Sequence, residues 1–309
     1  MDKTISLSDL QKIIDEVYES LKDANPGTVS VRFPEGRIKD FGISVALADG
    51  RGYDKGDVDV KFPLGSLVKV PIHCILLEQN GKVDLLKKAG ADITNPNYEK
   101  EQKPKLPISA HGIRSVSAIE PAGDPESKWN LIENKMIDLI GEAPELNENV
   151  YKGQKKVVEE SNVENSLAEA GYYLYDDARL SIELYLKAQA MSVSSRMLAK
   201  LGATIAADGY NASSKRNVYD GKLSADLVSY MADRGPHKMK KSWFLTTGLP
   251  AKSGFGGGIL AILPGVFAVA IYSPGLNNSD VSVRGIQALA MISEKLGINV
   301  FNSAKLVVK

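Results

Sequence analysis

A serine and a lysine three residues apart are the first pair in this sequence that could do chemistry. The segment FPLGSLVKVPI places Ser66 before Lys69, where short strands give way to an apolar helix. Residues three apart share a helix face, so the lysine amine can reach the serine hydroxyl. A desolvated amine loses its charge more easily and can accept the hydroxyl proton, which would let the serine form an acyl-enzyme. The alternative is that the serine caps the helix and the lysine extends to water.

A second element with the right chemistry lies far downstream, in GLPAKSGFGGG. Lys252, Ser253 and Gly254 end a strand-like run and resemble the Lys-Thr-Gly element that lines the cleft of serine β-lactamases and penicillin-binding proteins. The glycines here allow the backbone to approach a substrate, so an amide in this segment can join that of Ser66 in holding an oxyanion. A phosphate-binding glycine loop fits less well, because a strand rather than a helix N-terminus follows.

The elements that must position these residues begin with an amphipathic helix. Ser8 and Gln11 form a capping-box pattern, and apolar residues then recur on one helical face up to Leu21. Residues 41–65 read as short strands broken by Asp-Gly and Lys-Gly turns, which is typical of an antiparallel sheet. The chemistry-bearing serine follows directly at the exit of this sheet.

The rest of the chain is helical and then returns to strands. Residues from about 66 to about 233 show mostly helical periodicity, interrupted by a polar stretch at 94–112 and a charged one around 147–161. Three extended apolar runs follow, SWFLTTGLPAKSG, GGGILAILPG and VFAVAIYSPG, and VRGIQALAMISEKLG closes the pattern as a helix ending at Gly297.

Strands at both ends with helices between them predict an α/β fold, an α+β sandwich with an antiparallel sheet flanked by helices and an inserted, mainly helical lobe. We expect a single domain over 1–309, with a sheet lobe of about 1–65 and 242–309 and a helical lobe of about 66–241. The cleft is then expected between the two lobes.

Composition limits the partners and the compartment. Lys+Arg and Asp+Glu both number 38, so no global field attracts nucleic acid or a membrane surface. The single Cys74 lies in an apolar run and is expected to pack as a small hydrophobe, which fits a reducing compartment. No signal-peptide pattern or run of about 20 apolar residues is present, so we expect a cytoplasmic protein. Three scattered histidines and one cysteine give no zinc spacing, and no metal or cofactor is expected.

From about Gly171 to the end, the chain resembles the serine-dependent glutaminases, which share the β-lactamase and penicillin-binding-protein fold. The resemblance rests on LGATIAADGYN, GLPAKSGFGGGILAILPG, YSPGLNNSDVSVRG and LGINVF, which occur in the expected order. The middle of the chain is similar only loosely. The segment FPLGSLVKVPI resembles the nucleophile segment of class A β-lactamases at least as much as that of glutaminases, because a proline follows the lysine in the class A segment as it does here.

The resemblance implies catalytic roles for several residues. Ser66 would be the nucleophile, Lys69 its base and Tyr185 in IELYLKAQ the tyrosine that assists them, although a tyrosine at that place could also be a core aromatic of a helix. The backbone N–H groups of Ser66 and Phe255 would form the oxyanion hole. Lys252 and Ser253 would line the substrate pocket.

Other family positions are altered here, and they are the ones that hold the amino-acid head group. The family's glutamine before the nucleophile is Gly65, and the asparagine of its NAGA segment falls at or near Ala110. The family's tyrosine that closes the site aligns with His237, which is either a proton relay or a solvated loop histidine. His111 is expected to touch the substrate, and His73 to be structural.

The family's glutamate and asparagine that bind the substrate's charged ends have no clean counterpart. They are expected between about Gln154 and Asn165, where the candidates are Glu159, Glu160, Asn162 and Asn165. Each buried partner that is lost costs roughly 1–3 kcal/mol, so free L-glutamine is expected to bind poorly unless other residues replace these contacts.

The sequence therefore predicts a glutaminase-family serine amidohydrolase that acts on a small-molecule amide. An amidase or acyltransferase on a modified or conjugated acyl donor is the first alternative, a catalytically silent binding protein the second, and a β-lactam-directed activity the third. The absent export signal counts against the last. The resemblance also implies a homodimer or homotetramer.

Overall fold

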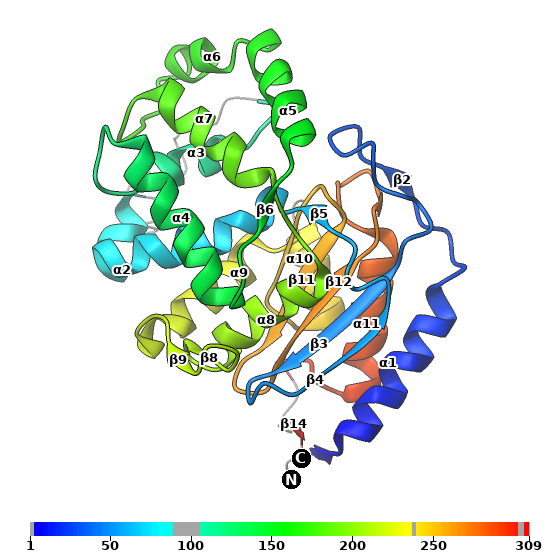
Figure 1. Cartoon of the computed structure of the whole chain (residues 1–309). Coiled ribbons are helices and arrows are strands. Elements are labelled where there is room, and N and C mark those ends of the chain that lie inside the picture. The colour runs from blue at the N-terminus through cyan, green and yellow to red at the C-terminus, as the bar shows by residue number, and fades with distance from the viewer. Residues whose placement is uncertain (1–2, 89–105, 237–238, 302–305, 309) are drawn as a thin grey trace.

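A five-stranded antiparallel sheet forms the centre of the computed structural model, which describes residues 3–88, 106–236, 239–301 and 306–308. Its strand order is β10-β11-β12-β3-β4, so strands from the two ends of the chain meet in the middle of the sheet (Figure 1). The strands are β3 (Gly42–Leu47), β4 (Gly52–Gly56), β10 (Ala251–Ser253), β11 (Gly258–Leu263) and β12 (Phe267–Tyr272). The predicted antiparallel sheet flanked by helices is confirmed.

Alternation along the strands divides the core into two layers. In β12, Phe267, Val269 and Ile271 pack with one apolar cluster, while the intervening Ala268, Ala270 and Tyr272 belong to the other. A strand with both faces apolar is buried on both sides, and all six residues of β12 are buried. Helices therefore must cover both faces of the sheet.

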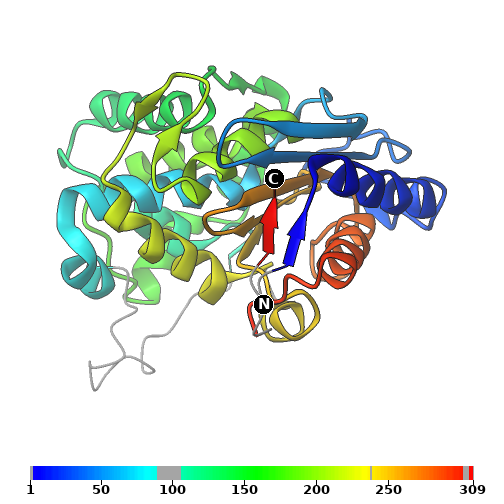
Figure 2. The same cartoon turned by 90° about the horizontal axis from the view of Figure 1, so that it is seen from below.

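One face is covered by helices from the two ends of the chain. Helices α1 (Leu7–Leu21) and α11 (Val283–Leu296) pack there, and α10 (Lys240–Thr247) adds Trp243 to the same cluster. Strands β1 (Lys3–Ile5) and β14 (Leu306–Val308) pair in parallel and lie side by side in Figure 2. Helix α11 ends at Gly297 in the left-handed conformation, as predicted.

The start of α1 differs from the prediction. Ser6 is the N-cap, and it forms the capping box with Asp9, whereas Ser8 lies inside the helix. Asp accepts hydrogen bonds at this position as Glu or Gln does, so the sequence contained two overlapping patterns and the earlier one is used.

The other face carries α8 (Ser195–Ala206) and, beyond it, the helical lobe. Helices of that lobe are α2 (Lys69–Lys88), α3 (Ala110–Ser117), α4 (Pro125–Ile140), α5 (Glu148–Glu160), α6 (Val163–Glu169), α7 (Ala178–Gln189) and α9 (Ser224–Arg234). Short strands outside the main sheet are β2 (Thr28–Val29), β5 (Phe62–Pro63), β6 (Glu145–Leu146), β7 (Met191–Val193), β8 (Tyr210–Asn211), β9 (Arg216–Asn217) and β13 (Gly275–Leu276). The expected boundaries of the lobes stay a prediction.

Two segments were predicted wrongly. Residues 147–161, expected to interrupt the helices, contain α5, which buries Val150, Gln154 and Val158 at a four-residue spacing. Residues 242–254, expected to be one extended run, begin inside α10 and become a strand only at Ala251. Aromatic and β-branched residues favour strands locally, but here the Trp243 side chain packs in the core from a helix that ends at Gly248.

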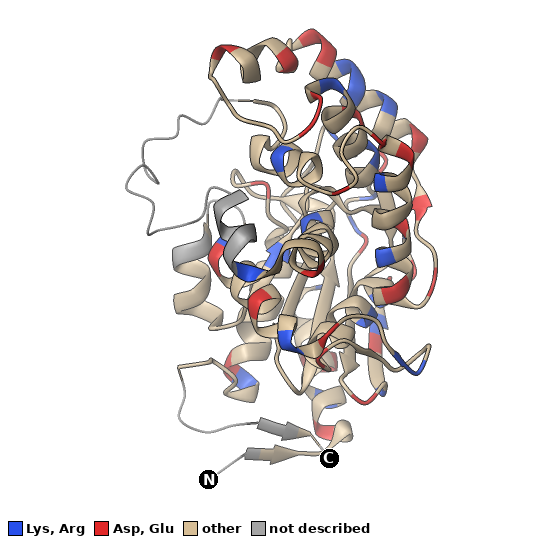
Figure 3. Ribbon diagram, turned by 90° about the vertical axis from the view of Figure 1, so that its left-hand side faces the viewer, with Lys and Arg blue, Asp and Glu red and all other residues tan. Residues whose placement is uncertain are grey.

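Charge and hydropathy of the described residues agree with the composition. Figure 3 shows Lys and Arg interspersed with Asp and Glu along the helices in that view, rather than separated onto two sides. Cys74 is fully buried among apolar side chains, as predicted. No helix in the described part of the chain is long and apolar enough to cross a membrane.

Candidate active site

Ser66 lies on a short 3-10 turn, η1 (Gly65–Val68), which leads directly into α2. The residue that precedes this turn is Leu64, and no side-chain hydrogen bond caps the turn, so the alternative in which Ser66 serves as a helix cap does not hold. Every other residue from 62 to 70 is buried, whereas Ser66 is partly exposed. The turn therefore presents one hydroxyl to solvent from an otherwise buried segment.

Lys69 follows at the first position of α2 and does not extend to water. Lys69 is only 8% exposed, and its Nζ donates a 2.7 Å hydrogen bond to the Ser109 hydroxyl. Burial, and then the positive charges of Lys252 and Arg234, hold the pKa of Lys69 well below its usual range. A lysine with a lowered pKa is available as a neutral amine that can take a proton.

Ser109 is a site residue that sequence reasoning missed. It is the N-cap of α3, where its hydroxyl also accepts a hydrogen bond from the Gly112 backbone N–H at 3.2 Å. Sequence reasoning placed a pocket residue at Ala110, but the pocket is lined by its two neighbours Ser109 and His111, together with residues 106–108, and not by Ala110. The capping serine just before the helix was the signal that could have found it.

Tyr185, predicted to assist catalysis, is a fully buried residue of α7. Its ring packs against Gly112 so closely that any Cβ there would overlap it. Burial raises the pKa of the Tyr185 hydroxyl, while the nearby Ser66 and Ser109 hydroxyls oppose the rise. No hydrogen bond of normal geometry joins this hydroxyl to the described residues, although it lies between two serines. It is a core aromatic that does not line the pocket, although its hydroxyl is close enough to Ser66 and Ser109 for both to influence its pKa.

The Lys-Ser-Gly segment lies opposite Ser66, on edge strand β10 and the turn after it. The backbone at Gly254 packs directly against the backbone at Leu64, because a Cβ on Gly254 would overlap the carbonyl oxygen of Leu64. Gly65 has φ +53°, and a Cβ there would lie 2.7 Å from the Phe255 ring and 3.0 Å from the Phe255 backbone nitrogen. The backbone before Ser66 and the backbone at Phe255, the two residues predicted to form the oxyanion hole, are thus packed closely together.

The same contacts explain Gly65 itself. A larger residue at this position would collide with Phe255, and positive φ also disfavours it. Gly65 is buried and is not among the residues that line the pocket. A glutamine could not occupy this position without a shift of Phe255.

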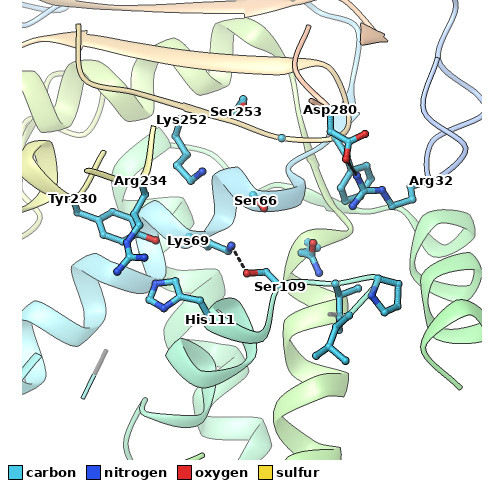
Figure 4. A pocket seen from close by; sticks show the side chains of 16 residues that line it. Arg32, Ser66, Lys69, Ser109, His111, Tyr230, Arg234, Lys252, Ser253 and Asp280 are labelled. Atoms are coloured by element: carbon cyan, nitrogen blue, oxygen red, sulfur yellow. Dashed lines mark hydrogen bonds and ion pairs between the residues drawn. The ribbon is translucent and has the colours of Figure 1, made fainter. Parts of the chain in front are cut away.

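Two further cations complete the charged side of the site. Lys252 is buried and donates to the Gly235 carbonyl at 3.2 Å, and burial together with Arg234 lowers its pKa to about 8. Arg234 and Tyr230 reach the site from α9. Figure 4 shows these two on one side of Ser66, with Arg32 and Asp280 on the other.

Most of these residues line a pocket of about 360 Å³, but Tyr185 and Gly65 do not. Predicted residues that line it are Ser66, Lys69, His111, Lys252, Ser253 and Phe255; unpredicted ones include Arg32, Ser109, Gln189, Tyr230, Arg234 and Asp280. His237 lies outside the described residues. His73 does not line the pocket; it stacks on Tyr230 with ring centroids 3.9 Å apart, and burial lowers its pKa to about 4.

The head-group candidates from α5 and α6 are not brought to this pocket. Asn162 and Glu159 line a separate pocket of about 260 Å³, and Asn162 is exposed at the start of α6. Arg32 and Asp280 also line the catalytic pocket, but they come from loops distant in the chain. No local sequence pattern therefore marks them as pocket residues. Within the described residues, no group of three or more His, Cys, Asp or Glu could hold a metal ion.

An antiparallel sheet flanked by helices, with a serine and a lysine on the first turn of a helix and a Lys-Ser-Gly strand opposite, defines the serine β-lactamase-like class of α/β proteins. The family model described as Glutaminase matches residues 33–301. The chain belongs to the glutaminase family.

Individual relatives agree over the whole length. A glutaminase of Bacteroides fragilis is 33% identical over 319 residues, covering 100% of this chain and 99% of the relative. A solved structure named as the probable glutaminase ybaS superimposes with a TM-score of 0.84 at 29% identity, covering 97% of this chain and 100% of its own. The Bacillus subtilis glutaminase YbgJ, solved as a covalent complex with 5-oxo-L-norleucine, has a TM-score of 0.80 at 22% identity over 95% of this chain and 99% of its own, and shows the shared fold.

Proposed function

We propose that the protein is a serine amidohydrolase of the glutaminase type, which releases ammonia from a primary carboxamide through an acyl-enzyme on Ser66. The observation that carries this proposal is the Ser66 and Lys69 pair itself. The hydroxyl is the one accessible group of a buried turn, and the amine beside it is buried with a pKa well below its usual range.

In the first half of the reaction, Ser66 Oγ attacks the carboxamide carbon and its proton passes to the neutral Lys69 amine. The carbonyl oxygen becomes an oxyanion, which the Ser66 and Phe255 N–H groups stabilise. The carbon–nitrogen bond then breaks, and the proton held by Lys69 goes to the leaving nitrogen. Ser109, hydrogen-bonded to Lys69 at 2.7 Å, provides the route for that proton.

In the second half, water attacks the ester carbon while Lys69 takes a proton from it. The ester bond breaks, and Ser66 recovers its proton. The products are one carboxylic acid and one ammonia for each amide and water consumed. Tyr185 supplies a hydroxyl near both serines, and its raised pKa keeps it neutral as a donor throughout.

The test is ammonia release from L-glutamine by the purified protein, with the Ser66→Ala and Lys69→Met variants beside it. Loss of release in both variants supports the proposal. Labelling with 6-diazo-5-oxo-L-norleucine followed by mass spectrometry gives a second readout that does not depend on turnover. If the folded parent releases no ammonia from any primary carboxamide and Ser66 takes up no label, the protein is a binding homologue instead.

A further inference from the structure

A second pocket adjoins the catalytic one and shares part of its wall. Its volume is about 300 Å³, and Arg32, Pro107 and Ile108 line both pockets. The remainder of its wall comes from the loop that follows β2 and from helix α5, and it is mostly apolar. The two pockets are therefore immediate neighbours.

Gln154 is the polar group buried in this second pocket. The residue is 4% exposed and lines the pocket, and neither Nε2 nor Oε1 has a hydrogen-bond partner among the described residues. Burying an amide without partners is unfavourable. A side-chain amide offers donors and an acceptor together, which is what another amide group needs. The pocket is thus built for an apolar group that carries an amide.

Arg32 lies on the shared wall with its guanidinium held in place. Its carbon Cζ is 4.5 Å from the centre of the Phe255 ring, and Nη2 donates to Asp280 at 3.1 Å. A guanidinium has five donor N–H groups in a planar fork, so it can bind a ligand carboxylate while it keeps Asp280.

The two pockets offer a poorer binding partner for the free α-ammonium group of an unacylated substrate. Asp280 is the one acidic residue among the described residues that line the catalytic pocket, and Arg32 already neutralises it. Glu35 is its counterpart in the second pocket, where it is exposed and accepts a 2.7 Å hydrogen bond from Asn149. A buried ammonium without a carboxylate partner is strongly disfavoured.

We propose that the preferred substrates are glutamine-type amides whose α-nitrogen is acylated, a proposal that rests on the serine amidohydrolase function above. The primary carboxamide lies at Ser66, the carboxylate at Arg32, and the acyl chain in the second pocket, where its amide pairs with Gln154. The reaction is unchanged: the carboxamide carbon–nitrogen bond breaks and ammonia leaves, while the acyl amide stays intact.

The experiment compares kcat/KM for ammonia release from L-glutamine, Nα-acetyl-L-glutamine and Nα-hexanoyl-L-glutamine. The hexanoyl substrate is expected to exceed L-glutamine by about 10-fold or more, because both the apolar chain and the amide gain partners. Gln154→Leu should lower the value for the two acylated substrates about 10-fold, a larger loss than for L-glutamine. Gln287→Leu, the same change at an exposed position of α11, is the matched control.

A pocket-filling variant tests the second compartment independently. Gly153 lines it, and a Cβ there meets no heavy atom of the described residues within 4 Å. Gly153→Leu should therefore fold normally and remove the advantage of the hexanoyl chain. Thermal unfolding confirms that each variant is folded.

The outcomes separate the two proposals. If L-glutamine is the best substrate of the three, the inference on acylation is overturned and the amidohydrolase function stands. A selective loss of L-glutamine activity in Glu35→Gln would also overturn it, because it would show that Glu35 holds an ammonium. If no amide releases ammonia and Ser66 takes up no label, the underlying function fails instead.

Discussion

Lys69 Nζ donates its hydrogen bond to Ser109, the serine that caps helix α3, at 2.7 Å. The amine that we propose as the base is therefore held by a residue from a different helix, some 40 positions further along the chain. One hydroxyl thus serves two purposes, because it accepts from both the Lys69 amine and the Gly112 backbone N–H.

We expect Ser109→Ala to lower kcat/KM by about 10²-fold, since a group that carries a proton in the transition state contributes at least this much. Loss of the cap should also lower the free energy of unfolding by about 1 kcal/mol. Ser194→Ala is the control, because Ser194 caps α8 in the same way, at 3.2 Å from the Met197 N–H, and does not line the pocket. An equal loss of activity in both variants would contradict a role for Ser109 beyond the cap.

Tyr185→Phe is expected to separate activity from stability. The Tyr185 hydroxyl is buried without a hydrogen-bond partner among the described residues, so its removal should raise the free energy of unfolding by about 1 kcal/mol. Because we propose that the hydroxyl acts as a donor in the reaction, kcat should fall about 10²-fold at the same time.

The matched control for this change is Tyr272→Phe. Tyr272 is also fully buried with an unpartnered hydroxyl, but it stacks on Phe62, and neither Ser66 nor Ser109 influences the pKa of its hydroxyl as they do that of Tyr185. It should gain similar stability with unchanged kcat. Denaturant titrations and steady-state rates measure both effects. Unchanged kcat in Tyr185→Phe would leave Tyr185 as a core aromatic only.

The position of the rising limb of the pH profile depends on Arg234. Its charge is one cause of the lowered pKa of Lys69, since a nearby cation disfavours the protonated amine. Arg234→Gln should therefore raise the pKa of Lys69 and move the rising limb of kcat/KM to higher pH. Rates from about pH 6 to 10 measure this shift. Arg216→Gln, at an exposed arginine outside the pocket, is the control. A lower rate with an unmoved limb would show that Arg234 acts on the substrate instead.

Much of this fold follows from sequence pattern, because alternating strands and helical apolar faces are local signals. The strands around β3, β11 and β12 and the helix ending at Gly297 were predicted in this way. Helix α10 was not, because its Trp and Thr residues favour strands locally and only core packing selects the helix.

The site residues likewise divide into those that a sequence pattern predicts and those that only the fold brings together. Ser66, Lys69 and Lys252 were found from their spacing and order, and the structure brings all three to one pocket. Arg32, Gln189 and Asp280 reach that pocket from other parts of the chain, and their types alone are ordinary surface or helix residues. Ala110 was one position away from the contact that matters, because an alignment without the helix cap does not fix the register of a loop.

Lys252 should make stability depend on pH. Its pKa is about 8 in the folded protein against an ordinary 10.5, so between these values the unfolded chain binds more protons than the folded one. The free energy of unfolding should then rise with pH across this window. At neutral pH the buried charge costs about 3 kcal/mol.

Lys252→Met should accordingly raise the free energy of unfolding at neutral pH by about 2 kcal/mol, after the loss of the bond to the Gly235 carbonyl. It should also flatten the rise between about pH 8 and 10. Lys222→Met, at an exposed position, should do neither. Urea titrations at several pH values measure these free energies of unfolding. A Lys252→Met variant that is less stable than the parent at neutral pH would show that the buried charge is not destabilising.

Gly65→Ala tests whether the close approach of the two backbones at the oxyanion hole matters for catalysis. The positive φ of 53° and the overlap of a Cβ with Phe255 should together lower the free energy of unfolding by about 3 kcal/mol. Because relief of this overlap requires Phe255 to move, its N–H should leave the oxyanion position and kcat should fall about 10²-fold.

Gly265→Ala is the control that separates backbone strain from the position of Phe255. Gly265 has φ +74° in an exposed turn, and a Cβ there meets no described atom within 4 Å. This control should lose about 1 kcal/mol and no activity. Full activity in a destabilised Gly65→Ala variant would mean that the Phe255 amide does not hold the oxyanion.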